Sequence, residues 1–241
     1  MGNPVTWFEI SGPQPEQTAR FYAELFGWET QAVPGGYILI DTHAGGGING
    51  GFGQTREGQP PHVVFYAENP DIQKVLDTAE SLGASIVVPV TNVPDMVTFA
   101  QFTDPFGILV GLVQGDGTAN VSAGDNAPVD WFELSCAEPE KAWDFYRELF
   151  GWDVQGDPGG QFAHGQVDTG GGIHGGIGGS PDGQPHAAMY ASVDDLQKYL
   201  ERAESLGGKT VMQPMQVDEH THIAVLVDPQ GTTFGLYSYQ A

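Results

Sequence analysis

The sequence is poor in cysteine, in basic side chains and in long apolar runs. Cys136 is the only cysteine among the 241 residues, which excludes an intrachain disulfide, and within a strand we expect a buried, unreactive thiol. Eight Lys and Arg stand against 31 Asp and Glu, for a formal net charge of −23. Such a surface repels phosphate groups, so we expect neither nucleic acid nor an anionic membrane as a partner.

No 18 consecutive residues are apolar, and the first residues lack the basic flank and apolar run of a signal peptide. We therefore expect no transmembrane helix and no secretory leader. The expected location is the cytoplasm.

What the sequence does contain is a long internal repeat. The octapeptide at residues 21–28, FYAELFGW, returns at residues 145–152 as FYRELFGW, 124 positions later. This period is far above that of solenoid repeats, so each copy is expected to be a domain with its own core. Further pairs keep the same register, namely WFE at 7–9 and 131–133, AESLG at 79–83 and 203–207, and DPFG at 104–107 with DPQG at 228–231.

Between the copies lies a segment that is rich in Gly, Asp, Asn, Ser and Ala and lacks apolar periodicity. Such a composition predicts a solvated linker. We therefore place a first domain at residues 1–115, a linker at 116–127 and a second domain at 128–241.

Each copy is predicted to open with a strand, Val5 to Ile10 or Val129 to Ser135, followed by an amphipathic helix. The helix ends at Gly27 or Gly151, because glycine supplies a left-handed C-terminal cap without steric cost. A second round of strand, helix and closely spaced strands follows, so each copy has the order βαββ and then βαβββ. The short turns between the late strands favour antiparallel hairpins, and we predict an α+β fold with a mixed sheet and helices on one face.

The order of these markers resembles the vicinal oxygen chelate superfamily, which includes glyoxalase I, fosfomycin and bleomycin resistance proteins and extradiol dioxygenases. The sequence is most similar in organisation to the tandem glyoxalase-like proteins of actinobacteria. The resemblance implies two domains, each a pair of βαβββ modules that curve a mixed sheet around a cavity. It also implies that the two domains pair within the chain, or that the chain forms a homodimer.

The resemblance further implies metal ligands on the first strand, on the strand that opens the second module and on the last strand. Indole does not ligate a divalent ion in its ordinary form, and glycine has no side chain to do so. A single surviving imidazole would hold a metal weakly, so we expect no cofactor. The residues at these positions in the two copies are Trp7 and Trp131, Gly111 and Gly235, and either Val64 and Ala188 or, two residues away, His62 and His186.

The first strands supply the sharpest catalytic candidates. Side chains two apart on a strand share a face, so Glu9 and Glu133 lie beside the tryptophans that replace the metal ligands. A carboxylate there is typical of a general acid or base, although backbone amides could equally satisfy it. The predicted catalytic set is Glu133, His186, His174, Glu9 and His62. The predicted ligand-binding set is Trp7, Tyr66, Trp131, Tyr190 and Asn49.

The two copies differ in histidine content, since the second contains five of the seven histidines. His220 and His222 lie two apart on an expected strand and, with His186, form an alternative metal site. The competing interpretation is a solvated strand end beside Asp218 and Glu219.

The glycine patterns at residues 45–50 and 170–175 match the dinucleotide fingerprint GxGxxG, but neither follows a strand into a helix. We therefore reject nucleotide binding there. The glycines are expected to let the sheet bend or a ligand approach the backbone.

These observations favour a protein that binds a small, partly aromatic molecule and transforms it without metal, by a lyase or isomerase type of proton transfer in the second domain. One alternative is a metal-dependent lyase or dioxygenase using the histidines of the second copy. The other is a non-catalytic protein that sequesters a drug or metabolite.

Overall fold

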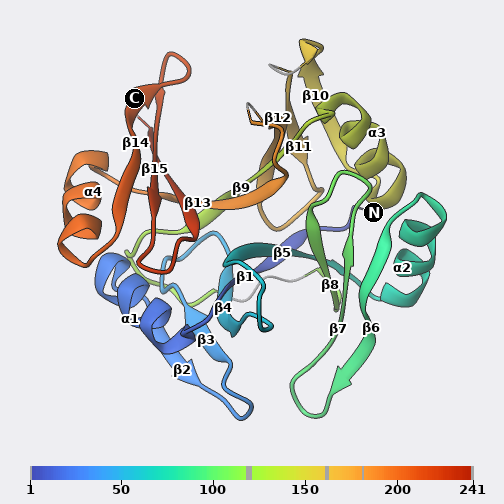
Figure 1. The fold of residues 1–241 in the computed structure, drawn as a ribbon, viewed down its shortest axis with the longest axis horizontal. Coiled ribbons are helices and arrows are strands. Elements are labelled where there is room, and N and C mark those ends of the chain that lie inside the picture. Colours follow the sequence, from blue (N-terminus) through green and yellow to red (C-terminus); the bar gives the residue numbers. More distant parts are fainter. Residues whose placement is uncertain (1, 118–120, 161–162, 181, 240–241) are drawn as a thin grey trace. The chain divides into compact units, whose positions relative to one another are not determined.

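The structure is a computed structural model that describes residues 2–117, 121–160, 163–180 and 182–239. Within these residues each copy contains two βαβββ modules (Figure 1). The first copy consists of β1 (Val5–Gly12), α1 (Pro15–Phe26), β2 (Glu29–Ala32), β3 (Ile38–Asp41), β4 (Asn49–Gln54), β5 (His62–Asn69), α2 (Ile72–Ser81), β6 (Ser85–Val93), β7 (Val97–Thr103) and β8 (Leu109–Gln114). The second consists of β9 (Val129–Cys136), α3 (Pro139–Phe150), β10 (Asp153–Asp157), β11 (His164–Asp168), β12 (His174–Gly179), β13 (His186–Ser192), α4 (Leu196–Ser205), β14 (Lys209–Gln216), β15 (Thr221–Val227) and β16 (Thr233–Tyr239).

The strands form two mixed sheets, which confirms the predicted α+β class. Their orders are β2-β3-β4-β1-β5-β8-β7-β6 and β10-β11-β12-β9-β13-β16-β15-β14. The βαββ order predicted for the first module of each copy was wrong, because β2 and β10 were not recognised. Every residue of β2 is exposed and β10 buries only Val154, so neither shows the apolar alternation by which strands are found.

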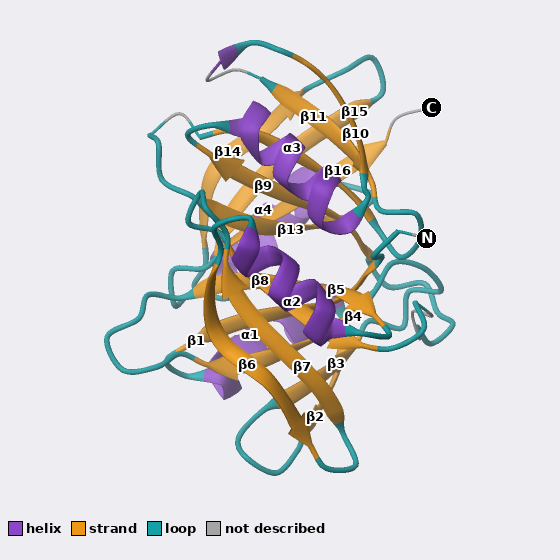
Figure 2. Cartoon of the chain, turned by 90° about the vertical axis from the view of Figure 1, so that its right-hand side faces the viewer, coloured by secondary structure: helices purple, strands orange, loops and turns teal. Residues whose placement is uncertain are grey.

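The helices follow the predicted pattern closely. The amide N–H of Gly27 donates to the Ala23 carbonyl at 2.9 Å and Gly27 has φ +80°, while Gly151 caps α3 in the same left-handed conformation. Each helix packs one apolar face on the strands of its own module, as Figure 2 shows for α2 and α3. No helix in the described part of the chain is long and apolar enough to cross a membrane.

Contacts divide the chain into two compact units, and each unit combines segments of both copies. The first unit consists of Met1–Trp7, Val64–Ala119 and Trp131–Ala187. The second consists of Phe8–Val63, Asn120–Asp130 and Ala188–Ala241.

The glycine-rich segments join the copies inside each unit. In the first unit the amide of Ile173 donates to the Val5 carbonyl at 3.0 Å, and in the second the amide of Ile48 donates to the Val129 carbonyl at 2.8 Å. A Cβ at Gly172 would lie 2.1 Å from the carbonyl oxygen of Val5. These glycines therefore admit the first strand of the other copy, and each segment leads into a strand rather than a helix, in agreement with the rejection of a nucleotide site.

Aromatic packing fills the core of the first unit. Phe65 stacks on Phe132 with ring centroids 5.3 Å apart, and Trp152 is 2% exposed, as expected for a core residue. The Tyr146 hydroxyl donates to the buried Asp104 carboxylate at 2.8 Å. Cys136 is fully buried, as predicted, and burial raises the pKa of its thiol to about 11, which disfavours the reactive thiolate.

Candidate functional site

The four strands β10, β11, β12 and β9 present a polar face on the side away from α3. Residues that pair across neighbouring strands point to the same side of a sheet, so the register identifies the face directly. Its members are Asp153, Gln155 and Asp157 on β10, His164, Gln166 and Asp168 on β11, His174, Gly176 and Gly178 on β12, and Trp131, Glu133 and Ser135 on β9. We call this set the polar face; it contains no aliphatic side chain.

Glu133 and His164 form an ion pair on the polar face. His164 Nε2 lies 3.0 Å from Glu133 Oε1, and the Trp131 indole N–H donates to Glu133 Oε2 at 3.2 Å. A carboxylate only accepts hydrogen bonds, so Nε2 carries the proton in this contact. The hydrogen bond to Glu133 raises the pKa of His164 above its ordinary value, and this effect exceeds the opposing effect of burial.

Glycine makes this pairing across the middle strand feasible. Glu133 lies on β9 and His164 on β11, with β12 between them. A Cβ at Gly176 would lie 2.3 Å from Glu133 Oε2 and 2.6 Å from His164 Nε2, and one at Gly178 would lie 3.1 Å from His164 Cδ2. The pair therefore spans β12 above two glycines, where an added Cβ would crowd the ends of both side chains. It remains open to solvent, since the His164 side chain is 49% and the Glu133 side chain 18% exposed.

The other predicted histidines do not contact Glu133. His174 lies at the edge of the polar face, where its Nδ1 is 3.4 Å from Asp168 Oδ1. His62 and His186 each place Nδ1 against a backbone carbonyl two residues earlier, at 3.0 and 3.3 Å. Two members of the predicted catalytic set thus have a titratable partner on this face: Glu133 pairs with His164, and His174 pairs with Asp168.

The first copy builds the corresponding face from different groups. The Ser11 hydroxyl donates to Glu9 Oε1 at 2.6 Å. A Cβ at Gly51 would lie 2.1 Å from the Tyr37 hydroxyl, and one at Gly53 would lie 2.7 Å from Glu9 Oε1. The glycine strand and the carboxylate are kept, but a phenol stands where the second copy has an imidazole.

Tyrosine rings occupy the space at two positions where the resemblance implies a metal ligand. On the parallel strands β5 and β8, Tyr66 pairs with Gly111, and a Cβ at that glycine would lie 2.3 Å from the ring. Tyr190 covers Gly235 in the same way, at 2.2 Å. A glutamate has no room at either glycine while the ring stays in place. With indoles at the first-strand positions as well, these residues do not fit the three-ligand metal site that the resemblance implies. The described residues contain no group of three or more His, Cys, Asp or Glu arranged to hold a metal ion.

The alternative metal ligands lie in different settings. His220 precedes β15, and its ring centroid is 5.4 Å from that of the exposed Tyr239. His222 lies within β15 opposite Ser238, and its Nδ1 is buried with no hydrogen-bond partner among the described residues.

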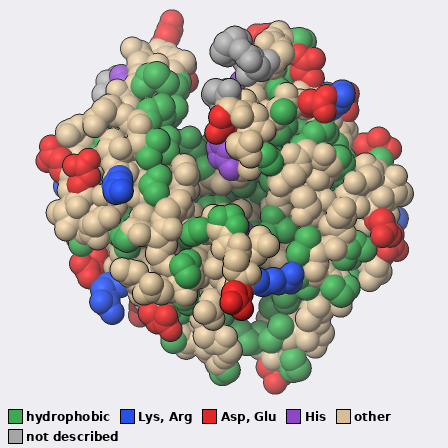
Figure 3. All heavy atoms as spheres, in the orientation of Figure 1, with side chains coloured by type: hydrophobic (Ala, Val, Ile, Leu, Met, Phe, Trp, Pro, Cys, Tyr) green, Lys and Arg blue, Asp and Glu red, His purple; other side chains and the backbone are tan. Residues whose placement is uncertain are grey.

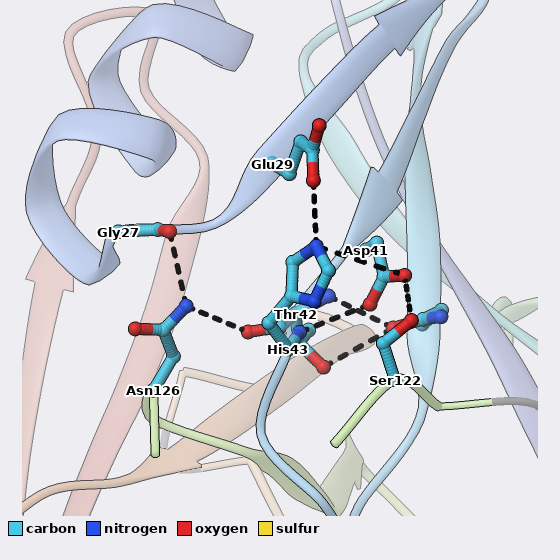
Figure 4. Close-up of polar contacts among 8 residues, drawn as sticks. Gly27, Glu29, Asp41, Thr42, His43, Ser122 and Asn126 are labelled. Carbon is cyan, nitrogen blue, oxygen red and sulfur yellow. Dashed lines mark hydrogen bonds and ion pairs between the residues drawn. The ribbon is translucent and has the colours of Figure 1, made fainter. Parts of the chain in front are cut away.

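A second histidine–carboxylate cluster, in the second unit, anchors the C-terminal part of the expected linker (Figure 4). His43 Nε2 lies 2.6 Å from Glu29 Oε2, and the Ser122 hydroxyl donates to Asp41. Burial opposes ionisation of Asp41, but hydrogen bonds from Ser122 and from the His43 amide together lower its pKa. Asn126 completes the anchor by donating to the carbonyls of Gly27 at 3.0 Å and Thr42 at 3.1 Å.

Two parts of the sequence prediction meet at this anchor. Asn49 accepts hydrogen bonds from the amide and hydroxyl of Thr42 at 2.9 and 3.1 Å, and its role in ligand binding stays a prediction. Within the predicted solvated segment at 116–127, Ser122 and Asn126 hydrogen-bond to the backbone of the first copy. Residues 123–125 are exposed, and residues 118–120 lie outside the described part. The Trp28 indole also donates to the Ala127 carbonyl at 3.0 Å.

His164 is the functional candidate that sequence reasoning missed. The constant spacing of 124 does not align it with Tyr37. The Asp-Thr pairs at 41–42 and 168–169 lie 127 apart, and this local offset would have placed the imidazole opposite the phenol.

Comparison with known proteins agrees with the geometry of both copies. Residues 5–112 match the model of the Glyoxalase/Bleomycin resistance protein/Dioxygenase superfamily, and residues 131–237 match that of a glyoxalase-like domain. The chain belongs to the glyoxalase superfamily. The predicted resemblance is therefore confirmed, in both copies.

Relatives and structural neighbours of this glyoxalase-superfamily chain carry several names. It is 26% identical to "Putative glyoxylase CFP32" of Mycobacterium tuberculosis, covering 98% of this chain and 94% of that one. It is 25% identical to anthracycline biosynthesis protein DnrV of Streptomyces peucetius, covering 95% and 91%. Among solved structures it resembles a Mn(II)-bound glyoxalase from Novosphingobium aromaticivorans, with a TM-score of 0.71, 16% identity and coverage of 98% and 82%. At that identity the likeness concerns the fold.

Proposed function

We propose that this glyoxalase-superfamily protein binds a small, partly aromatic molecule at the polar face and transforms it by acid–base chemistry without a metal. The observation that carries the proposal is the His164–Glu133 pair on an open sheet face. Glu133 holds the Nε2 proton, which leaves Nδ1 to exchange a proton with the ligand. The reaction class is a lyase or isomerase step.

The surroundings of the pair support binding of a partly aromatic ligand. Trp131 offers a half-buried amphipathic ring beside the carboxylate, and indole rings are favourable contact surfaces for aromatic molecules. Anthracyclines are polycyclic aromatic ketones, and the name of the Streptomyces relative connects it with their biosynthesis. We extend that ligand class to this chain as part of the proposal.

The proposal is tested first by binding and then by turnover. Aryl ketones, phenols, anthracyclines and 2-oxoaldehydes are screened for thermal stabilisation, and stabilising compounds are followed by NMR for conversion. We expect E133Q to retain binding while kcat falls by about 10²- to 10⁴-fold, the range of general acid–base catalysis. The matched control E9Q, in the other copy, leaves kcat within about twofold by the same criterion. Unchanged turnover in E133Q would overturn catalysis and leave sequestration as the function.

Metal independence is tested separately. Protein without a His tag is incubated with Mn, Fe(II), Ni and Zn, passed through a desalting column and analysed for metal. We expect less than about half an equivalent per chain, because working sites of this kind bind close to one equivalent. Stoichiometric metal that is lost in H220A/H222A would instead support the metal-dependent alternative.

A further inference from the structure

The four strands β13, β16, β15 and β14 of the second copy present a partly exposed apolar surface. Residues that pair across these strands point to the same side of the sheet. The residues that alternate with them, such as Ala224, Leu226 and Leu236, are fully buried on the side where α4 packs (Figure 1). We call the following six side chains the apolar face: Tyr190 on β13, Tyr237 on β16, Ile223 and Val225 on β15, and Met212 and Met215 on β14.

The carboxylate of Asp130 joins the apolar face through Tyr237. The Ser192 side chain hydrogen-bonds to Tyr237, and the Tyr237 side chain hydrogen-bonds to Asp130. Oδ1 of Asp130 is nevertheless buried with no hydrogen-bond partner among the described residues. Burial raises the pKa of this carboxyl to about 6, although the hydrogen bonds from Tyr237 and from its own amide oppose the rise. A buried carboxylate oxygen without a donor costs free energy, so an additional donor at this place is favourable.

The first copy places a carboxylate and a hydroxyl at the same two positions in the opposite order. At the spacing of 124, Asp130 corresponds to Thr6 and Ser192 to Glu68. The Thr6 hydroxyl donates to Glu68 Oε2 at 2.6 Å, and the Gly117 amide donates to Glu68 Oε1 at 2.7 Å. Both oxygens of this carboxylate therefore have a donor, whereas one oxygen of Asp130 has none.

The surrounding face differs between the copies in the same sense. In the first copy Gln101 stands at the position of Val225 and donates to the Tyr66 hydroxyl at 2.7 Å. Val113 stands at the position of Tyr237. The carboxylate with an unpaired oxygen therefore occurs in the copy whose face is more apolar and carries the additional aromatic ring.

We infer that the second copy binds an aromatic amine, with the ammonium group on Asp130 and the aromatic body against the apolar face. An ammonium group only donates hydrogen bonds, and it supplies both the donor and the opposite charge that Asp130 Oδ1 lacks. The rings of Tyr190 and Tyr237 are favourable surfaces for a cation and for an aromatic body. The formal net charge of −23 attracts a cation to the protein.

Two further observations define the setting of this site. Asp130 as a residue is partly exposed, and rotation about its Cβ–Cγ bond presents the unpaired oxygen to a ligand. Asp130, Ser192 and the apolar face all belong to the second unit, whereas the polar face belongs to the first. The inference therefore does not depend on acid–base chemistry at the polar face.

The binding test uses two probes of the same shape, 1-naphthylmethylamine and 1-ethylnaphthalene, which differ by an ammonium in place of a methyl group. Calorimetry at about pH 8, where Asp130 is ionised, and at about 0.15 M salt, where distant exposed charges are screened, measures both affinities. We expect the wild type to bind the amine about 10- to 100-fold more tightly, as a hydrogen bond between charged groups supplies. D130N should abolish this preference and leave the affinity for 1-ethylnaphthalene within about twofold.

The matched control is E68Q, which removes one negative charge from the corresponding place in the first copy and should retain the preference. D130T introduces the residue of the first copy and should behave as D130N does, which guards against a folding defect in one variant. Thermal unfolding of each variant confirms that it is folded.

Each failure has a distinct meaning. If the wild type shows no preference for the amine, or if the preference survives in both D130N and D130T, the role of Asp130 is overturned. If D130N and E68Q reduce the preference equally, the amine is attracted by the acidic surface in general and the site is overturned. All three results leave the proposed function at the polar face unchanged.

The location of the aromatic body is tested by NMR of the methyl groups of Ile223 and Val225. We expect both probes to shift these signals, and V225Q, which introduces the residue of the first copy, to weaken both probes by the same factor while the preference for the amine remains. Shifts confined to methyl groups outside the apolar face would overturn its role in binding.

Discussion

The first module of each copy holds the same carboxylate beside the same glycine strand, yet it gives that carboxylate different partners. In the first copy Ser11 donates to Glu9, and Tyr37 lies over Gly51. In the second copy Glu133 pairs with His164. Among side chains, imidazole is the one suited to exchange a proton near neutral pH, and only the second arrangement contains it. Duplication therefore preserved the steric frame and changed the group that can move a proton.

We expect the largest change in activity when the partner residues of the two copies are exchanged. His164→Tyr converts the second copy to the pattern of the first, and we expect kcat to fall by about 10²- to 10⁴-fold because the group that titrates near neutral pH is removed. Tyr37→His should leave kcat within about twofold by the same argument. Steady-state kinetics on a compound from the stabilisation screen measures both. A fall caused by Tyr37→His but not by His164→Tyr would assign the activity to the first copy.

Substitutions at two adjacent glycines of β12 should affect stability and activity differently. A Cβ at Gly175 would lie 2.6 Å from the ring of the fully buried Phe132, so Gly175→Ala should lower the free energy of unfolding by about 1–3 kcal/mol. Gly176→Ala meets only the mobile ends of Glu133 and His164, and should reduce turnover with a smaller loss of stability. Urea unfolding and kinetics of both variants test this. Equal losses of stability would contradict the assignment of the two faces.

The pH dependence of protein stability should reveal the hydrogen bond between His164 and Glu133, which has no counterpart in the first copy. The pKa of His164 is raised in the folded protein, so the pair contributes stability that is fully present below the unfolded value near 6.5 and is lost as pH rises through the folded value. In Glu133→Gln the pKa of His164 should fall, and the stability deficit of this variant should be largest at low pH. NMR titration of the His164 ring and unfolding at several pH values measure these effects. A deficit that grows with rising pH would contradict the ion pair.

Replacement of the Trp131 indole should have the smallest effect on activity. Trp131→Phe removes the 3.2 Å donor to Glu133 but keeps an aromatic ring, so we expect a loss of about 0.5–1.5 kcal/mol, equivalent to a several-fold change in kcat/KM. A change above about 100-fold would instead indicate that the indole contributes more than one hydrogen bond and a ring that phenylalanine can replace. The kcat and KM values of the variant separate these cases.

Much of the fold was accessible from the sequence because its determinants are local. Apolar spacing predicted helices α1 and α3, and the glycines that follow them predicted where each helix ends. The repeat showed that these features occur twice. Strands β2 and β10 were missed because their side chains face solvent on most positions. Their pairing depends on the neighbouring strands β3 and β11, which is not a local property.

The site was predictable only in part. Glu133 was identified because it lies two residues from Trp131 on a strand. Its partner His164 lies 31 residues away, and their contact depends on the register of three strands and on the absence of side chains at two glycines. The expectation of an acidic surface needed no such information, and Figure 3 shows acidic side chains distributed around the visible face with few Lys and Arg among them.

The composition of the two contact units has a consequence for how the chain folds as it is made. The first unit requires segments that end at Ala187, and the second requires segments up to the C-terminal strand. Neither can be completed when only the first copy has left the ribosome, since its strand β1 must still meet the glycine segment before β12. We therefore expect both units to be completed only after the second copy has been synthesised.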